Sequence, residues 1–506
     1  MSAILVAAVL SVMHYEGDVP AAGGDYQDVA IQVPAGTVEI DIAHSDGSDY
    51  TILDWGVWGP DGYRGWGGGL SDDAIIGVEQ SSRGYLPGAI TPGTWTVVIG
   101  KAQLDTGGGH YTIDVTCSDA ATLPVLPKAP FAAPVLSTER RWYRGDFHVH
   151  SFQSGDASAT FDEIIALAKA QGLDFANISD HNTVAQHALL AAIQPAHPDL
   201  LFLRGAEITT YGGHANAVGI SSYVDHRIGY NGRTIADVVA DVTAQGGIFI
   251  VNHPVLDLGT ACIGCFWSHV ADTPWDQVTG LEVLTGNFDI GINAFYPRAI
   301  ALWDQELAAG NKIAAIGGSD DHTAGMNESS TGSPIGEPTT LVLADNLSEA
   351  AIIDAVKHGH TQVDLQGPGA PVVDFHYTKH DGTQAEIGDD EIDDGDTHFS
   401  FPVHITGGNG TFVQLWNDGT KVDQVAVTSD DFTTTFERDP SGKLERFRIQ
   451  LINDINQPIV VTSHIYVTGA IASGCGCRAA GPAGGLVPFG LVALVLRRRR
   501  RGSARA

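Results

Sequence analysis

The stretch from Gly145 to Asp156 reads GDFHVHSFQSGD, and it opens the part of the chain that decides the fold. His148 and His150 alternate at the end of a strand-like run, so on a β-strand both imidazoles would face the same side. A helical pattern follows at residues 161–172, and the same order of buried strand and helix recurs as far as Gly367. Repeated β/α units predict a parallel sheet, and this many of them over residues 142–367 predict a closed barrel.

Nearly every strand expected in residues 142–367 ends in a side chain that can bind a metal ion. These side chains are His148, His150, Asp180, His181, Glu207, His253, Asp320 and His322. The carboxyl ends of barrel strands meet at one mouth, so we expect these groups to converge. Imidazoles suit Zn, Mn, Fe or Ni, and a carboxylate can bridge two cations. The second His-x-His pair, His358 and His360, ends a helical pattern instead, and we expect it at the surface.

The segments on either side of this region have strand patterns. Residues 26–118 and residues 370–468 show short alternating runs separated by glycine, proline and aspartate, which predicts an N-terminal and a C-terminal β-sandwich. A proline-rich linker covers residues 119–141. The acidic run from Gly388 to Asp396 lacks the spacing of a calcium-binding EF-hand loop, and it predicts a solvated loop.

Composition limits the classes of function. A chain of 506 residues is too long for one core, and its apolar content of 43% is typical of folded domains. The net charge of −33, from 27 basic and 60 acidic residues, argues against a nucleic acid partner. Cys262 and Cys265 form a CxxC with no second pair at zinc-finger spacing. That pattern favours a local disulfide over a structural zinc site.

The two ends predict export. Residues 1–18 contain an apolar run of the length found in signal peptides. Residues 474–506 contain a cysteine pair, a short uncharged stretch that would act as a transmembrane segment, and an arginine cluster from Arg497 to Arg501. This order resembles the myxobacterial-type C-terminal sorting signal (MYXO-CTERM). A plain membrane anchor would give the same topology. We expect a protein anchored in the membrane or held at the cell surface, its catalytic domain outside the cytoplasm, with sorting machinery as a partner.

The ordered motifs of the middle region carry a second resemblance. They are HVH at 148–150, SDHN at 179–182, GAEIT at 205–209 with GGHANAVG at 212–219, NHP at 252–254, and GSDDH at 318–322. This set resembles the PHP (polymerase and histidinol phosphatase) superfamily of metallohydrolases, and most of all the carbaryl hydrolase branch (CehA/McbA type). The GPDGYRGWGGG motif at 59–69 is similar to the leading sandwich of that branch. The resemblance implies an α/β fold: a distorted (β/α)7 TIM-like barrel flanked by two β-sandwiches.

The resemblance also implies two or three divalent metal ions, Zn, Mn or Fe. One ion would be bound by His148, His150, Glu207 and Asp320, and Glu207 would bridge to a second ion. The second ion would also be held by His253 and His214. A third site would use Asp156, His181 and His322, where this chain departs from the usual residues that follow the serine.

Roles in catalysis follow from the same resemblance. A metal-bound hydroxide would attack the substrate, and His322, His181 or His214 would protonate the leaving group. The catalytic residues we predict are therefore His214, Asp180 and His322. Asp180, with Asn182, would orient ligands rather than bind metal. Asp321 would point away, and Glu282 ranks below the others.

Three functions agree with this pattern. The first is a phosphoesterase acting on a small-molecule phosphate ester at the cell surface. The second is hydrolysis of a carbamate or carboxyl ester, and the third is a non-catalytic surface module. A phosphate specialist would place a basic residue at the mouth, and the candidates are Arg144, Arg204 and Arg227.

Overall fold

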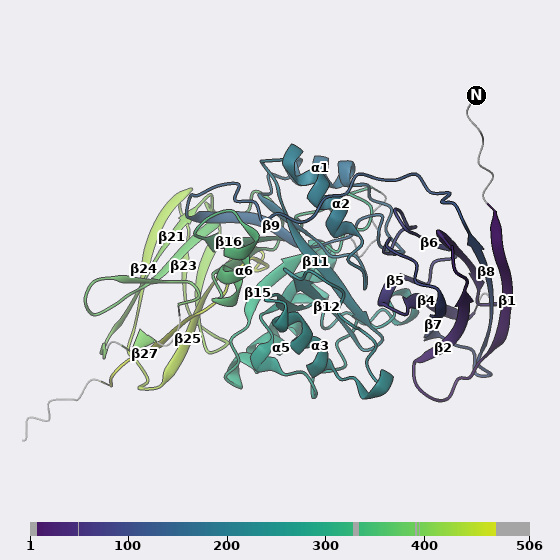
Figure 1. The fold of residues 1–506 in the computed structure, drawn as a ribbon. Helices are drawn as coiled ribbons and strands as arrows, with labels where there is room; N and C mark the ends of the chain where they lie inside the picture. The colour runs from purple at the N-terminus through teal and green to yellow at the C-terminus, as the bar shows by residue number, and fades with distance from the viewer. Residues whose placement is uncertain (1–7, 49, 327–332, 390–391, 394, 472–506) are drawn as a thin grey trace, which may run out of the picture.

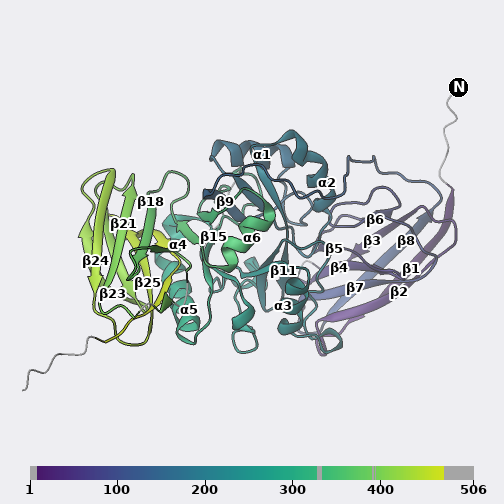
Figure 2. The same ribbon diagram turned by 60° about the vertical axis from the view of Figure 1, so that its left-hand side comes forward.

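The computed structural model describes residues 8–48, 50–326, 333–389, 392–393 and 395–471. Over these residues the protein is a strand-rich mixed α/β structure with several sheets. A central region that carries the six described α-helices lies between two regions built of strands (Figures 1 and 2). The transmembrane segment and sorting signal predicted at residues 474–506 lie outside the described residues. Within the described ranges, no helix is long and apolar enough to cross a membrane.

The N-terminal region consists of two four-stranded antiparallel sheets packed face to face. Their shared core includes Ile31, Trp95 and Ile113. The first sheet has the order β1 (Val9–Val19), β8 (Gly109–Ser118), β3 (Glu39–Ser45), β6 (Ala74–Gly77). The second has the order β2 (Tyr26–Val33), β7 (Gly93–Gln103), β4 (Ile52–Gly59), β5 (Gly62–Gly68).

The first sheet includes a segment that we predicted to be part of an export signal. Strand β1 pairs with β8 from Val9 opposite Ser118 to Val19 opposite Gly109. Its side chains alternate, and Met13 and Tyr15 pack against the core of the sandwich. Residues 9–18 therefore belong to the folded sheet, which corrects the boundary we set at Tyr26. Export itself stays a prediction.

The central region is a series of seven strands bonded in chain order. They are β9 (Arg141–Val149), β10 (Phe175–Ile178), β11 (Leu201–Thr210), β12 (Gly213–Val218), β13 (Ile248–Val251), β14 (Gly280–Thr285) and β15 (Ala314–Gly318). Strands β9, β10 and β11 are parallel, and so are β13, β14 and β15. Strand β12 is antiparallel to both of its neighbours.

The antiparallel strand has a local cause. The chain turns from Thr210 to Gly213, where φ of 155° suits glycine, so β11 and β12 form a hairpin that needs no crossover helix. The uniform repetition of β/α units that we predicted is therefore wrong at β12. The strand pairing gives a mixed sheet, and closure of this sheet into a barrel stays a prediction. An isolated bridge between Val149 and Asp321 brings the segment after β15 back beside β9.

Six helices pack on this sheet. They are α1 (Phe161–Ala170), α2 (Gln186–Ile193), α3 (Ile235–Ala244), α4 (Phe288–Ala294), α5 (Tyr296–Ala308) and α6 (Glu349–Lys357). Helices α1 and α3 begin with capping boxes, formed by Thr160 with Glu163 and by Thr234 with Asp237. Helical patterns at residues 161–172, 182–193, 234–246 and 348–359 predicted α1, α2, α3 and α6. We did not recognise a pattern for α4 or α5.

The C-terminal region shares a sheet with the central region. Strand β9 continues through β16 (Thr339–Ala344), β17 (Thr361–Asp364), β26 (Pro458–Thr462), β25 (Leu444–Ile452), β22 (Phe412–Asn417) and β23 (Thr420–Ala426). Short strands β20 (Ile392–Asp393) and β27 (Ile465–Thr468) join its edge. A four-stranded sheet packs against strands β22 and β25 of this sheet. Its order is β19 (Gln384–Glu386), β18 (Val372–Thr378), β21 (Phe399–Thr406), β24 (Asp431–Arg438). Backbone hydrogen bonds between paired strands thus join this sandwich to the central region.

Candidate metal centre

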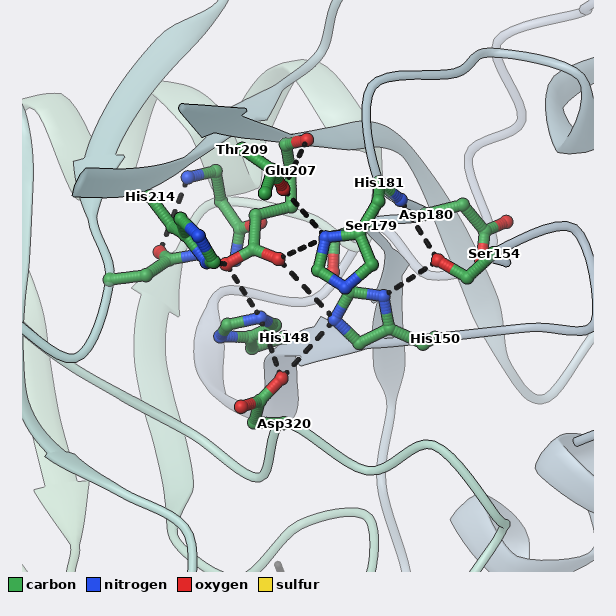
Figure 3. Close-up of polar contacts among 12 residues, drawn as sticks. His148, His150, Ser154, Ser179, Asp180, His181, Glu207, Thr209, His214 and Asp320 are labelled. Atoms are coloured by element: carbon green, nitrogen blue, oxygen red, sulfur yellow. Dashed lines mark hydrogen bonds and ion pairs between the residues drawn. The ribbon is translucent and has the colours of Figure 1, made fainter. Parts of the chain in front are cut away.

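Four side chains meet where strands β9, β11 and β15 end (Figure 3). The Oδ1 atom of Asp320 lies 3.1 Å from Nε2 of His148 and 3.2 Å from Nε2 of His150. Glu207, in β11, places Oε1 3.2 Å from Nε2 of His148 and Oε2 3.7 Å from Nε2 of His150. The four groups predicted for the first ion therefore face one another in one cluster.

Three donor atoms of this cluster lack hydrogen-bond partners within the described part of the chain. The Nε2 atoms of His148 and His150 and the Oε2 atom of Glu207 are buried without one. A buried polar atom left in this state costs free energy. A cation bound by all three atoms would explain why they face one another without hydrogen-bond partners. Imidazole nitrogens with carboxylate oxygens are a donor set that suits Zn, Mn or Fe, so the residues fit a divalent metal ion.

A second group of donors shares Glu207. Its Oε1 atom lies 3.3 Å from Nε2 of His253, which follows β13, and 3.5 Å from Nδ1 of His214, in β12. Cys265 lies close enough to His214 and His253 to complete a set of three donors. Its sulfur, however, is bonded to Cys262, which confirms the predicted local disulfide.

A third group lies nearer to solvent. The Oδ2 atom of Asp156 is 3.3 Å from Nε2 of His181 and 3.5 Å from Nε2 of His322. The ring of His150 stacks on the rings of His181 and His322, at centroid distances of 4.4 Å and 4.1 Å. The side chain of Asp156 is 60% exposed, whereas those of His148 and His150 are fully buried. The third group is thus the most open of the three.

Neighbouring side chains hold the donors in place. Glu282 accepts from Nδ1 of His148 at 2.9 Å and from the backbone of His253 at 2.8 Å, a larger role than the sequence suggested. Asp180 accepts two 2.7 Å bonds from the backbone and the hydroxyl of Ser151. Both carboxylate oxygens of Asp180 are used in this way, so it positions the loop after β9. A catalytic role for it stays a prediction.

Two turns hold ligands in a strained backbone. His253 has φ of 27° and Asp320 has φ of 58°, in the left-handed region that side chains other than glycine rarely adopt. Asn182, predicted to orient ligands, has φ of 52°, and its side chain bonds both the amide and the carbonyl of Thr209. Such residues cluster at functional sites, where the surrounding structure enforces them.

Buried carboxylates and imidazoles set the electrostatics. Burial alone would lower the pKa of His148, but the carboxylates of Asp320 and Glu207 raise that pKa well above its usual value. Burial alone would raise the pKa of Glu207, but the imidazoles of His148 and His181 hold it well below the usual range. Burial lowers the pKa of His150 to about 3. In the metal-free chain protons balance the carboxylates, and a divalent cation would replace those protons.

A cavity of about 820 Å³ opens over the centre. Its walls come from the metal centre, the loop after β13, helix α4 and the N-terminal sandwich, and they include apolar side chains such as Leu70, Val255 and Phe295. Arg298 is the basic residue in its described lining. Arg298 was not predicted, because it lies on α5, a helix that we did not recognise in the sequence.

The three arginines that we predicted at the mouth are engaged elsewhere. Ion pairs join Arg144 to Asp364 at 3.2 Å, Arg204 to Glu349 at 2.6 Å, and Arg227 to Asp225 at 2.8 Å. None of the three belongs to the described lining of the cavity, so the prediction is wrong. Asp364 and Glu349 are distant in the sequence from their arginine partners, whereas Asp225 precedes Arg227 by two residues.

The second His-x-His pair lies apart from the centre. His358 follows α6, and its side chain is 61% exposed. His360 is partly buried, with Nε2 3.6 Å from Asp389. Neither residue belongs to a candidate metal cluster of the described chain.

Comparison with known proteins finds no matching family model and no matching curated protein. Among solved structures, the chain is similar to a two-domain protein from Bacteroides vulgatus described as containing a predicted PHP-like metal-dependent phosphoesterase. The identity is 18%, the match covers 67% of this chain and 100% of that chain, and the TM-score is 0.35. A β-glucuronidase from Bacteroides uniformis matches at 12% identity over 88% of this chain and 74% of that chain, with a TM-score of 0.18. Both likenesses are too weak to transfer a function, which therefore depends on the site geometry.

Proposed function

We propose that this protein is a metal-dependent hydrolase that cleaves phosphate esters. The observation that supports the proposal is the cluster of buried donors without partners, formed by His148, His150 and Glu207 beneath a cavity of about 820 Å³. A closed structural site would leave no room for a substrate beside the ions, whereas Glu207, His253 and Asp320 of this centre line the cavity.

The donor groups divide among two or three ions. His148, His150, Glu207 and Asp320 would hold the first, Glu207, His214 and His253 the second, and Asp156, His181 and His322 the third. Divalent cations bound there would lower the pKa of water and polarise the ester oxygen.

The chain's own residues supply the remaining steps. His322 directs Nδ1 to the carbonyl of Asp320 at 2.8 Å, which leaves Nε2 facing the cavity beside Asp156. With the first two sites occupied and the third site empty, His322 is the proton donor that we assign to the leaving oxygen. His214 donates from Nε2 to the carbonyl of Ile263 and turns Nδ1 toward Glu207, an arrangement that suits a ligand better than a proton donor. Arg298 at the cavity is placed to attract an anionic ester.

Three finer assignments belong to the same proposal. The ordered motifs support membership of the PHP superfamily, in the carbaryl hydrolase branch, with the strand series of the central region as a distorted barrel. The order of cysteine pair, uncharged stretch and arginine cluster at residues 474–506 supports export and retention at the cell surface. The same centre would also accept a carbamate or carboxyl ester, and the substrate test decides between the two classes.

The test uses the full chain, stripped of metal with a chelator and reloaded with Mn or Zn. Substrates are an aryl phosphate, a bis-aryl phosphate, an aryl ester and an aryl carbamate with the same leaving group. We expect metal-dependent turnover of the phosphate esters, and loss of that turnover in Glu207→Gln. Turnover of the aryl ester or carbamate alone would overturn the phosphate assignment in favour of the second class. Turnover of no substrate would favour a non-catalytic module.

A further inference from the structure

The cavity extends beyond the metal centre to the N-terminal sandwich. There its lining is formed by Tyr26, Asp54 and Trp66 of the sandwich and by Tyr211 and His226 of the central region. We call these five residues the seam recess. No metal ligand belongs to it, so it offers a place for a part of the substrate that does not react.

A glycine in the second sheet of the N-terminal sandwich makes room for the recess. Gly100 in β7 stands opposite Tyr26 in β2 on one side and opposite Asp54 in β4 on the other. A Cβ atom at Gly100 would overlap the hydroxyl of Tyr211 and lie 3.2 Å from the ring of Trp66. Glycine at this position therefore lets Tyr211, from the turn between β11 and β12, reach the sheet between its neighbours.

Two acceptor atoms of the recess receive no hydrogen bond from the described residues. Tyr211 donates a 2.7 Å hydrogen bond to Oδ2 of Asp54, and the described residues provide no hydrogen bond to Oδ1. Burial raises the pKa of Asp54 to about 6, as expected for a carboxylate without a cationic partner. The side chain of His226 is 1% exposed, and its Nε2 atom has no partner in the described chain.

The tautomer of His226 is assigned from its contact with Tyr223. The Tyr223 hydroxyl lies 3.2 Å from Oδ1 of Asp225 and 3.0 Å from Nδ1 of His226. We assign the single hydroxyl proton to the carboxylate, so that Nδ1 of His226 donates to the Tyr223 oxygen. The Nε2 atom is then a bare acceptor. Burial lowers the pKa of His226 to about 3, so the ring stays neutral.

The walls of the recess are aromatic. The ring centroid of Tyr26 is 5.7 Å from that of Tyr211 and 6.3 Å from that of Trp66, and Trp66 lies 4.4 Å from His226. Arg227, the adjacent cation, is taken up by its ion pair with Asp225 and by the rings of Trp58 and Tyr230. Aromatic faces with a carboxylate and a neutral acceptor form a site for a cation that can donate hydrogen bonds.

We propose that the seam recess binds a primary ammonium group of the substrate, with Asp54 as its counter-ion and His226 as a second acceptor. This inference rests on the proposed ester hydrolysis and names its substrate class: a phosphate ester that carries an aminoalkyl arm. The N-terminal sandwich is then part of the substrate site and selects the arm that does not react.

The test compares three diesters that share a 4-nitrophenyl leaving group and differ in one arm: 2-aminoethyl, 2-(trimethylammonio)ethyl and 2-hydroxyethyl. We expect kcat/KM for the aminoethyl ester to exceed that for the hydroxyethyl ester by about 10-fold to 100-fold, because one charge-assisted hydrogen bond is worth that factor. In Asp54→Asn the preference should fall to about 3-fold or less. Equal values for these two esters in the wild type would overturn the proposal. So would a trimethylammonio ester that equals or exceeds the aminoethyl ester, since it lacks N–H donors.

Two controls keep the result interpretable. Asp61→Asn, an exposed position on the same sandwich, should keep the wild-type preference. If Asp54→Asn does not fold, as judged by thermal denaturation, His226→Phe keeps a ring, loses the acceptor and should lower the preference at least about 3-fold. Unchanged preference in a folded variant would contradict the assignment.

A binding measurement separates this inference from the proposed function. If no ester is cleaved, the hydrolase proposal fails, and calorimetry with propylammonium and with 1-propanol still tests the recess. Binding of propylammonium to the wild type but not to Asp54→Asn would support the recess on its own. Absence of propylammonium binding, or equal binding of both compounds, would reject it.

Discussion

Asn252 donates a 2.7 Å hydrogen bond from Nδ2 to Oε1 of Glu207, and both side chains are fully buried. The Oδ1 atom of Asn252 accepts from the backbone of Asn216 at 3.2 Å, which fixes the orientation of the amide. The same Oε1 atom faces the imidazoles of His148 and His253. Asn252 therefore holds the carboxylate that two groups of donors share.

Replacement of Asn252 should weaken metal binding without removing a ligand. We expect Asn252→Ala to lower the affinity for Zn or Mn by about 10-fold to 100-fold, because Glu207 loses the bond that orients it. Competition with a chromogenic chelator measures the change. Asn409→Ala, at an exposed position of the C-terminal sandwich, serves as the matched control. An unchanged affinity in Asn252→Ala would show that Glu207 needs no such support.

Glu207 should decide how many ions the protein holds. Glu207→Ala removes both oxygens that face the histidines, so we expect elemental analysis to find at least one ion fewer per chain than in the wild type. His358→Ala changes an exposed histidine outside the centre and should leave metal content and rate unchanged. Full metal content in Glu207→Ala, or a large loss in His358→Ala, would mean that the wrong residues were assigned.

The third group should be separable from the other two. Asp156 contacts His181 and His322 but belongs to no group that contains His148 or His253. We expect Asp156→Asn to lose the weakest ion and to retain the ions bound around Glu207. Stepwise titration with Mn, followed by calorimetry, measures the number of sites. Loss of all ions in this variant would show that the three groups act as one site.

The sequence predicted the candidate metal ligands better than it predicted the residues that surround them. Eight of the nine predicted ligands lie within a strand or at most four residues after one, and Asp156 lies in the loop after β9. Strand ends can be read from apolar runs followed by polar residues. Asn252 could have been found, because it directly precedes His253 in the chain. Glu282 also follows a strand, but its contacts with His148 and His253 depend on how the strands are ordered in space.

Other parts of the site depend on contacts that no local pattern records. Asp54 lies in a strand of the N-terminal sandwich, and it borders the cavity only because Tyr211 packs over Gly100. The antiparallel course of β12 escaped prediction although only Tyr211 and Gly212 separate it from β11, too few residues for the crossover that a parallel strand needs. Arg298 contributes through the position of α5, a helix that we did not predict although its buried residues Ala299, Trp303 and Leu307 recur at helical spacing.

A buried histidine away from the centre should make stability depend on pH. His187, in α2, is 8% exposed, and its Nε2 atom bonds the carbonyl of Gly205 at 2.9 Å. Burial lowers its pKa to about 4, whereas in the unfolded chain the usual value is near 6.5. Between these values the unfolded state binds more protons than the folded state. The free energy of unfolding therefore decreases as the pH falls through this window.

The comparison of wild type with His187→Gln isolates this contribution, because glutamine can donate to Gly205 and does not titrate. Between about pH 7.5 and pH 5, we expect the wild type to lose about 2 kcal/mol more than the variant, since one pKa unit corresponds to about 1.4 kcal/mol. The pH dependence of the thermal denaturation temperature measures the difference. His398→Gln, at an exposed position, should follow the wild type. Parallel curves for the wild type and His187→Gln would show that His187 accepts a proton as readily in the folded protein as in the unfolded chain.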